Sequence, residues 1–229
     1  MTRLTAVSAL LILSVFLCAN AFAINLVTNG RFETGDFTGW TVLTQSGSYG
    51  NWYVSGPGNT PASGHPSVGP ASGNFYAVTD QTGQGCQVLY QMVTVPSPET
   101  ITVSFDMFAN NWDGGTYING LDYTIYPNEH CRVDVLQPNA NPFSTSPADI
   151  IQNFFLGGAP VGAPQAYTHY SFTASDVSPG TYMLRFAEVD NSGYFSQGVD
   201  NVRVYTPEPS SALFLLTALP FAGLLRRRK

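Results

Sequence analysis

The sequence predicts an all-β protein, an antiparallel two-sheet β-sandwich of the jelly-roll type. Ile101, Val103, Phe105 and Met107 alternate with Thr102, Ser104 and Asp106, and Tyr182, Leu184 and Phe186 alternate with Met183, Arg185 and Ala187. This period of two is typical of two-faced strands. Clusters of Gly, Pro, Asn and Asp, such as 55–59 and 113–115, separate these runs and indicate turns. Residues 24–206 contain no long helical period. Strands without interleaved helices pack as two facing antiparallel sheets.

The first 23 residues have the features of a secretory signal peptide. Arg3 supplies a positive start, Leu4–Cys18 is almost entirely apolar, and Ala21-Phe22-Ala23 has the small-x-small pattern that signal peptidase accepts. We therefore predict a signal helix over 1–23 that is removed after Ala23, and export of the remaining chain through the inner membrane.

Residues 24–206 form one predicted domain, long enough to bury a sizeable core. Trp40–Thr44 begins its series of strands, and Ala148–Phe155 is the one stretch where the sequence allows a short helix. The other predicted strands are 51–55, 75–79, 87–95, 101–107, 121–126, 132–136, 166–173, 182–187 and 199–205.

The predicted domain is strongly acidic. It contains no Lys, its cations are Arg31, Arg132, Arg185 and Arg203, and every acidic residue of the chain except Glu208 lies within it, so its net charge is about −10. Such a surface argues against nucleic acid and anionic membranes as partners. It is compatible with divalent cations and neutral glycans.

Two cysteines, Cys86 and Cys131, remain after removal of the signal peptide. An even number of cysteines in an exported protein favours a disulfide over a metal site. We therefore predict a Cys86–Cys131 disulfide.

Aromatic residues in or beside predicted loops indicate that the domain binds glycans by stacking these rings on sugar rings. Rings flanked by Asn and Asp can stack on a sugar while the polar groups bond its hydroxyls. The alternative is that these rings are ordinary core or strand residues. The candidates are Trp52, Trp112, Tyr117 and Tyr194.

No catalytic motif is present, and we expect the protein not to be an enzyme. The sequence has no nucleophile elbow, zinc-protease motif, phosphate loop or dinucleotide fingerprint. Asp106 with Asp122, or Glu188 with Asp190, could supply the two carboxylates of a glycan hydrolase. The alternative for Glu188 and Asp190 is a solvated strand end.

The last 23 residues, 207–229, differ from the rest of the chain. Pro207-Glu208-Pro209 cannot continue a strand or helix and ends the domain. An apolar segment follows over 211–225, about 22 Å long as a helix and short of the roughly 30 Å hydrocarbon core. The chain ends in four cations that belong on the cytoplasmic side of a membrane, Arg226, Arg227, Arg228 and Lys229.

This order of Pro-Glu-Pro, short transmembrane helix and basic end resembles the PEP-CTERM sorting signal of Gram-negative bacteria. The resemblance implies that an exosortase recognises the tail and passes the protein to the cell surface or the exopolysaccharide matrix. The alternative is a plain single-pass anchor, for which the apolar segment is short.

The two ends of the domain resemble galactose-binding-like jelly rolls and several carbohydrate-binding modules. The similar stretches are Asn25–Trp40 at the opening and Gly198–Val204 at the close. In that fold the first and last strands pair, and Asp200 is expected to share the core-facing side of its strand with Val202 and Val204. In the resembling modules the equivalent positions bind structural Ca²⁺, and hard oxygen ligands suit this ion. The resemblance carries this role to Glu33 and Asp200, with Asn29 and Asn201 as further candidates; the alternative is that the two carboxylates cap backbone N–H groups or pair with Arg31.

Together these features predict an exported, surface-directed, non-enzymatic protein. Its domain is either a carbohydrate-binding module that binds exopolysaccharide or a structural or adhesive protein without a specific sugar ligand. A secreted hydrolase that acts on glycans, or a plain single-pass surface protein anchored in the membrane, is also compatible with the sequence.

Overall fold

A computed structural model describes residues 24–162 and 164–206. These residues form ten β-strands and no α-helix. The strands are β1 (Thr41–Thr44), β2 (Gly50–Ser55), β3 (Tyr76–Gln81), β4 (Gly85–Val95), β5 (Glu99–Asn111), β6 (Glu129–Leu136), β7 (Ile150–Gly157), β8 (Thr168–Val177), β9 (Gly180–Asp190) and β10 (Phe195–Tyr205).

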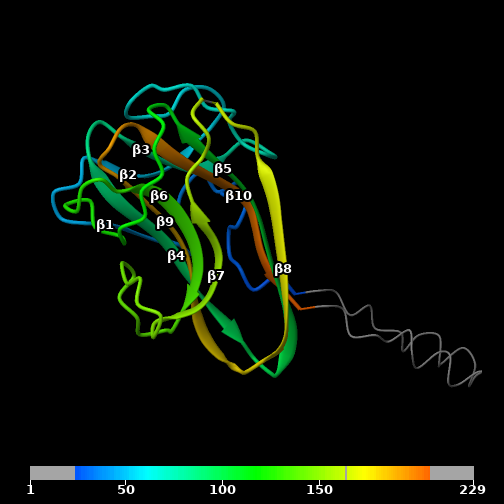
Figure 1. Cartoon of the computed structure of the whole chain (residues 1–229). Helices are drawn as coiled ribbons and strands as arrows, with labels where there is room; N and C mark the ends of the chain where they lie inside the picture. The colour runs from blue at the N-terminus through cyan, green and yellow to red at the C-terminus, as the bar shows by residue number, and fades with distance from the viewer. Residues whose placement is uncertain (1–23, 163, 207–229) are drawn as a thin grey trace, which may run out of the picture. The chain divides into compact units, whose positions relative to one another are not determined.

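The strands are arranged in two five-stranded antiparallel sheets that face each other (Figure 1). Sheet 1 has the order β1-β4-β9-β6-β7, and sheet 2 has the order β2-β3-β10-β5-β8. All pairings within both sheets are antiparallel. The predicted two-sheet sandwich is therefore confirmed.

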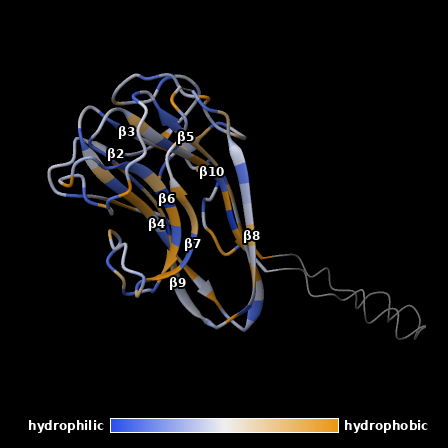
Figure 2. Ribbon diagram, viewed as in Figure 1, coloured by the Kyte–Doolittle hydropathy of each residue, from blue (hydrophilic) through white to orange (hydrophobic). Residues whose placement is uncertain are grey.

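The main core lies between the sheets and follows from the period-two alternation of the strands (Figure 2). On β9, Leu184 and Phe186 face inward and belong to this core, whereas Ala187 belongs to a second cluster on the outer face of sheet 1. Loop residues Leu121 and Tyr123 complete that second cluster. Sheet 1 is therefore buried on both faces over part of its area.

The segment before β1 runs beside the last strand, as expected for this fold. Asn25 forms an antiparallel bridge with Tyr205, and the Val202 amide donates to the Gly30 carbonyl at 2.7 Å. A Cβ added at Gly30 would lie 2.0 Å from the Val202 carbonyl oxygen. Only glycine allows this approach.

Two predicted elements are wrong. Residues 150–157 form strand β7 rather than a helix, because they pair with β6. Residues 121–126 form turns rather than a strand. There the Asp122 carboxylate accepts the Thr124 backbone amide at 2.9 Å, a local bond that competes with strand pairing.

The predicted disulfide is not formed, and both cysteines are free and buried. Cys86 on β4 pairs with Val189, and Cys131 on β6 pairs with Glu188 on the same central strand β9. Strand β9 thus lies between the two cysteines, and their partners on β9 are neighbouring residues. Neighbouring positions along a strand face opposite sides, so Cys131 lies in the main core and Cys86 in the outer cluster. This geometry is incompatible with a disulfide.

The predicted signal helix, the sorting motif at Pro207, Glu208 and Pro209, the apolar helix 211–225 and the basic residues 226–229 lie outside the described residues. Within 24–162 and 164–206 there is no helix long and apolar enough to cross a membrane.

Candidate functional site

A polar hollow of about 420 Å³ lies where three connections meet. They are the β1–β2 connection, the tight turn between β3 and β4, and the segment between β9 and β10. We call it the loop-end hollow. Its lining residues are Tyr49, Thr82, Gly83, Gln84, Asn191 and Gly193.

Tyr49 is the large aromatic side chain of this hollow, and 67% of it is exposed. Its backbone is bonded on both sides to the opposite turn: the Tyr49 amide donates to the Gln84 carbonyl at 3.0 Å, and the Thr82 amide donates to the Tyr49 carbonyl at 3.2 Å. The ring rests against Gly83, where an added Cβ would lie 3.3 Å from the ring Cγ. The backbone of Tyr49 is therefore held in place, and its exposed ring is accompanied by the exposed polar side chains of Thr82 and Gln84.

Asn191, another lining residue of the hollow, forms four hydrogen bonds. Its side-chain oxygen accepts the Asn128 amide at 2.7 Å, and its backbone amide donates to the Asn128 carbonyl at 3.0 Å. Its side-chain nitrogen donates to the carbonyls of Tyr123 and Ile125. The polar capacity of Asn191 is thus used in holding the loop in place.

A half-buried aromatic cluster follows directly in sequence after Gly193. The rings of His65 and Tyr194 are stacked with their centroids 3.7 Å apart, and Trp112 approaches both at 4.7 and 4.8 Å. The Trp112 amide also donates to the Tyr194 carbonyl at 3.1 Å. Two of the four predicted stacking residues, Trp112 and Tyr194, are therefore brought together.

Fully buried Asp80 on β3 anchors this cluster. Its carboxylate accepts hydrogen bonds from the Tyr194 hydroxyl, from the Ser63 hydroxyl at 2.6 Å, and from the backbone amides of Ala62 and Ser63. Burial alone would raise the pKa of Asp80, but the hydrogen bonds from Ser63 and Tyr194 outweigh it and hold the pKa below its ordinary value. Asp80 is therefore an ionised anchor that connects loop 60–65 to Tyr194.

The other two predicted stacking residues are not part of this site. Trp52 is only 2% exposed and belongs to the main core, because its position on β2 faces inward. Its assignment to sugar stacking is wrong. Tyr117 is exposed but pairs with Glu129 and does not line the loop-end hollow.

The predicted calcium residues meet at a different place, around loop 71–75. The Glu33 carboxylate accepts the backbone amides of Asn74 at 2.9 Å and Phe75 at 3.2 Å, and these bonds lower the pKa of Glu33. The Asp200 carboxylate accepts the amides of Ser72 at 3.0 Å and Asn201 at 2.6 Å. Both carboxylates therefore cap backbone N–H groups, those of loop 71–75 and, for Asp200, also that of the next residue on β10.

Asp200 faces the outer side of sheet 2, and the expectation that it shares the core-facing side with Val202 is wrong. A bulge between Asp200 and Arg203, with Asn201 at a positive φ of 53°, breaks the alternation. Asp200 is nevertheless fully buried, and burial raises its pKa to about 6.

The two amides predicted to assist a metal also serve local bonds. The Asn29 side-chain nitrogen donates to the Asp36 carbonyl at 2.9 Å, and that of Asn201 donates to Asp106 at 2.7 Å. No three His, Cys, Asp or Glu side chains within 24–162 and 164–206 are grouped so as to hold a metal ion. The groups that contact the Glu33 and Asp200 carboxylates are N–H donors rather than oxygen atoms that could share a metal ion. Calcium binding there stays a prediction.

The carboxylate pairs considered for hydrolysis do not form an open site. Asp106 lies on the outer face of sheet 2, whereas Asp122 lies in the loop that covers the outer face of sheet 1. Glu188 and Asp190 are 0% and 1% exposed, so the interpretation as a solvated strand end is wrong.

An apolar cleft of about 520 Å³ opens between the edge strands β7 and β8. Phe154, Phe172 and Tyr182 are among its lining residues, and most of its other lining side chains are apolar. Such a lining offers few hydrogen-bond partners for a polar ligand, in contrast to the loop-end hollow.

The fold is similar to that of carbohydrate-binding modules. No model of a known protein family matches the chain, and no curated protein matches its sequence. Among solved structures, TmCBM61 in complex with β-1,4-galactotriose is similar with a TM-score of 0.52 and 13% identity, over 80% of this chain and 99% of that chain. The chain is therefore a jelly-roll β-sandwich of the kind found in such modules.

Two other solved structures are less similar. The K3 cleaved adhesin domain of Lys-gingipain from Porphyromonas gingivalis W83 has a TM-score of 0.48 and 16% identity, over 81% of this chain and 100% of that chain. A Stig cyclase from Fischerella sp. TAU has a TM-score of 0.47 and 14% identity, over 82% of this chain and 100% of that chain. At these TM-scores neither likeness carries an argument about function.

Tyr49 is the main site residue that sequence reasoning missed. Its position between Ser48 and Gly50, in a stretch of small and polar residues, was a usable signal of an exposed ring. The turn 82–84 that completes the hollow lies more than thirty residues away and could not be assigned to it from spacing.

Proposed function

We propose that the chain is a non-catalytic carbohydrate-binding domain and that the loop-end hollow is its glycan site. The observation that carries this proposal is Tyr49, an exposed aromatic residue whose backbone is hydrogen-bonded on both sides and whose ring lies against Gly83. A rigid ring offers its face to the C–H groups of a sugar at little cost in conformational entropy. Thr82 and Gln84 supply the nearby polar groups that bond hydroxyls.

The ligand class follows from the charge of the hollow. No Arg, Lys, Asp or Glu is among its lining residues. An uncharged aromatic and amide lining suits a neutral oligosaccharide. Because TmCBM61 was solved with β-1,4-galactotriose, a short neutral galactan is the first ligand to test.

We expect Tyr49→Ala to weaken binding of a neutral oligosaccharide about tenfold or more, since it removes the stacking surface while leaving the fold intact. Isothermal titration calorimetry against neutral oligosaccharides chosen from a glycan array measures this change. Tyr117→Ala is the matched control, because it removes an exposed ring that does not line the hollow. Trp112→Ala is expected to weaken binding less, through loss of the cluster beside Gly193.

Equal binding by wild type and Tyr49→Ala would refute this site. Absence of binding to every neutral glycan, including the host's own polysaccharide, would instead favour a structural or adhesive protein without a specific sugar ligand. Release of reducing sugar from a bound glycan would favour a hydrolase.

We further propose that the domain is exported and sorted to the cell surface or the exopolysaccharide matrix of a Gram-negative bacterium. The support is the resemblance of 207–229 to a PEP-CTERM signal and of 1–23 to a signal peptide. Signal peptidase and an exosortase are then its processing partners.

Intact-protein mass spectrometry of the surface and medium fractions of the host tests this sorting. We expect a mass that begins at Ile24 and ends near Pro207–Pro209. A mass that retains 211–229 would mean that the tail serves as a plain membrane anchor.

A further inference from the structure

A second hollow, of about 410 Å³, lies on the outer face of sheet 2 and is lined by charged residues. Asp106 on β5 pairs in register with His169 on β8 and with Asp200 on β10. The bulge in β10 then places Arg203 opposite Ser104, on the same outer face. We call this the arginine hollow, and its lining residues are Arg31, Ser72, Ser104, Asp106, His169, Asn201 and Arg203.

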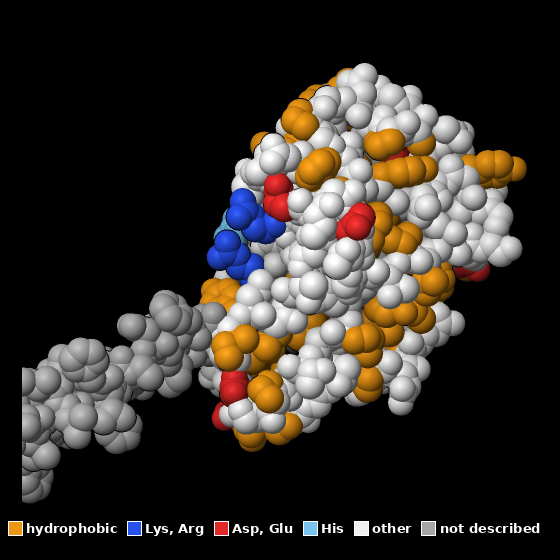
Figure 3. All heavy atoms as spheres, turned by 180° about the vertical axis from the view of Figure 1, so that it is seen from behind, with side chains coloured by type: hydrophobic (Ala, Val, Ile, Leu, Met, Phe, Trp, Pro, Cys, Tyr) orange, Lys and Arg blue, Asp and Glu red, His pale blue; other side chains and the backbone are white. Residues whose placement is uncertain are grey.

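The exposed positive charge of the described domain is concentrated in this hollow. Of its four arginines, Arg132 and Arg185 are buried around Asp134. The other two, Arg31 and Arg203, are exposed, and both line the arginine hollow. Figure 3 shows the blue arginine side chains gathered beside a pale-blue histidine on this face. This clustering contrasts with a domain that carries about ten net negative charges.

Neither exposed guanidinium forms an ion pair within the part of the chain that the structure describes. Arg31 donates only to the Ser72 hydroxyl, at 3.2 Å, and no hydrogen bond from the Arg203 side chain is found there. Guanidinium groups bind carboxylates through two parallel hydrogen bonds. Two such groups lining one hollow are therefore available to an anionic ligand.

The remaining polar groups of the hollow are fixed by a chain of hydrogen bonds. The Asp106 carboxylate accepts His169 Nδ1 and Asn201 Nδ2, each at 2.7 Å, and the Asn201 oxygen accepts the Ser72 hydroxyl at 2.8 Å. The Ser72 hydroxyl in turn accepts Arg31. These groups are thus held in place before any ligand arrives, which lowers the entropy cost of binding.

We propose that the arginine hollow binds a uronic-acid residue of an acidic polysaccharide. Arg203 and Arg31 would bind the sugar carboxylate, while Asp106 accepts hydrogen bonds from the sugar hydroxyls. A sugar acid matches this mixed lining because it has both acceptor oxygens and hydroxyl donors. Inorganic phosphate or sulfate presents mainly acceptor oxygens and lacks the row of hydroxyl donors that a sugar offers to Asp106.

This site is independent of the proposed glycan site at Tyr49. The two hollows share no lining residue, and they take ligands of different charge. Failure of one proposal therefore leaves the other standing.

The test compares an oligogalacturonate with the same oligosaccharide after methyl esterification, which replaces each carboxylate with a neutral methyl ester and leaves the sugar hydroxyls unchanged. We expect the wild-type chain to bind the acid at least tenfold more tightly than the ester in calorimetry, and salt to weaken the acid complex. Arg203→Gln and Arg31→Gln are each expected to lower affinity for the acid at least tenfold. Arg203→Lys is expected to recover only part of it, because an ammonium cannot bind in the two-pronged geometry.

Tyr49→Ala should leave affinity for the acid unchanged. Circular dichroism checks that each arginine variant is folded. Equal affinity for acid and ester, or unchanged affinity in both arginine variants, would overturn the proposal. Competition by inorganic sulfate as strong as that by the oligogalacturonate would also overturn it, since the site would then bind any small anion.

Discussion

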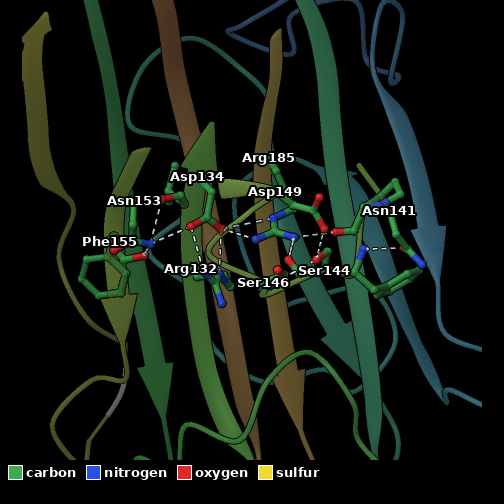
Figure 4. A network of polar contacts seen from close by, with 12 residues as sticks. Arg132, Asp134, Asn141, Ser144, Ser146, Asp149, Asn153, Phe155 and Arg185 are labelled. Carbon is green, nitrogen blue, oxygen red and sulfur yellow. Dashed lines mark hydrogen bonds and ion pairs between the residues drawn. The ribbon is translucent and has the colours of Figure 1, made fainter. Parts of the chain in front are cut away.

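Asp134→Ala is expected to lower the free energy of unfolding by about 3–5 kcal/mol. Asp134 on β6 is fully buried on the outer face of sheet 1, between two buried arginines (Figure 4). Arg132 donates to it through Nε at 2.7 Å and Nη2 at 2.9 Å, and Arg185 donates through Nε at 3.2 Å and through Nη2. Removing this carboxylate leaves two buried guanidinium groups without a counter-charge.

The surrounding bonds hold this group together. Asn153 on β7 donates to Asp134 at 2.7 Å, and Arg185 Nη1 donates to the carbonyls of Pro142 and Ser144, each at 2.7 Å. Loop 137–149 is thus tied to the sheet through Arg185, and we expect it to become open to proteolysis in the variant. Burial alone would raise the pKa of Asp134, but the arginines outweigh it and lower the pKa, so this contribution is lost only as the pH falls below the ordinary range of Asp.

Urea denaturation at neutral pH measures the loss, which corresponds to a fall in melting temperature of roughly 10 °C. Asp176→Asn is the matched control, because it removes one carboxylate from an exposed position on β8 whose positive φ asparagine tolerates. We expect the control to change stability by less than about 0.5 kcal/mol. An equal effect of the two substitutions would show that Asp134 does not neutralise the arginines.

Raising the pH from 5 to 8 is expected to lower the stability of the wild-type chain, and Glu188→Gln is expected to remove much of this loss. Glu188 on β9 is fully buried on the inner face of sheet 1, and neither of its carboxylate oxygens has a hydrogen-bond partner among the described residues. Burial raises its pKa well above the ordinary value, and neighbouring Asp190 adds to the shift. Burial therefore favours the protonated form of Glu188 in the folded chain.

The sign of the pH dependence follows from which state holds the proton. As the pH rises, a carboxyl group with a raised pKa stays protonated in the folded chain after the unfolded chain has released its proton. Its stabilising contribution is therefore complete below the ordinary pKa and is lost as the pH rises through the pKa of the folded state. Burial also raises the pKa of Glu129 to about 7 and that of Asp190 to about 6. The stabilising contributions of these two carboxyl groups are therefore lost between about pH 4 and 7. Buried His130 acts in the opposite direction, because burial lowers its pKa to about 4. One histidine opposes several carboxyl groups, so the net effect is a loss of stability with rising pH.

Urea denaturation at pH 5, 6.5 and 8 measures this slope. Each proton that only the folded chain retains lowers the free energy of unfolding by about 1.4 kcal/mol per unit rise in pH. Glu188→Gln removes one such proton and should flatten the slope, whereas Asp176→Asn should leave it as in the wild type. Wild-type stability that rises from pH 5 to 8, or an unchanged slope in Glu188→Gln, would contradict the raised pKa of Glu188.

Much of the fold could be predicted from local patterns. The alternation at 182–187 predicted a two-faced strand, because the side-chain period of a strand depends only on neighbouring residues. In the structure Leu184 and Phe186 face the core between the sheets, and Arg185 lies buried on the opposite face. The same reasoning failed at β7, where a short apolar run is compatible with helix and strand until a partner strand is known. It also failed at Asp200, where a bulge interrupts the period.

The sequence by itself determined the class of this protein: two-faced strands separated by turn residues, an acidic domain without lysine, and distinctive segments at both ends. Only the tertiary structure decided which residues meet. It placed Cys86 and Cys131 on opposite faces of one sheet, brought Tyr49 against turn 82–84, and gathered Arg31 and Arg203 around Asp106. The physical reason is that burial alternates along a single strand, whereas contacts between distant residues depend on strand order, register and loop path, which no local pattern contains.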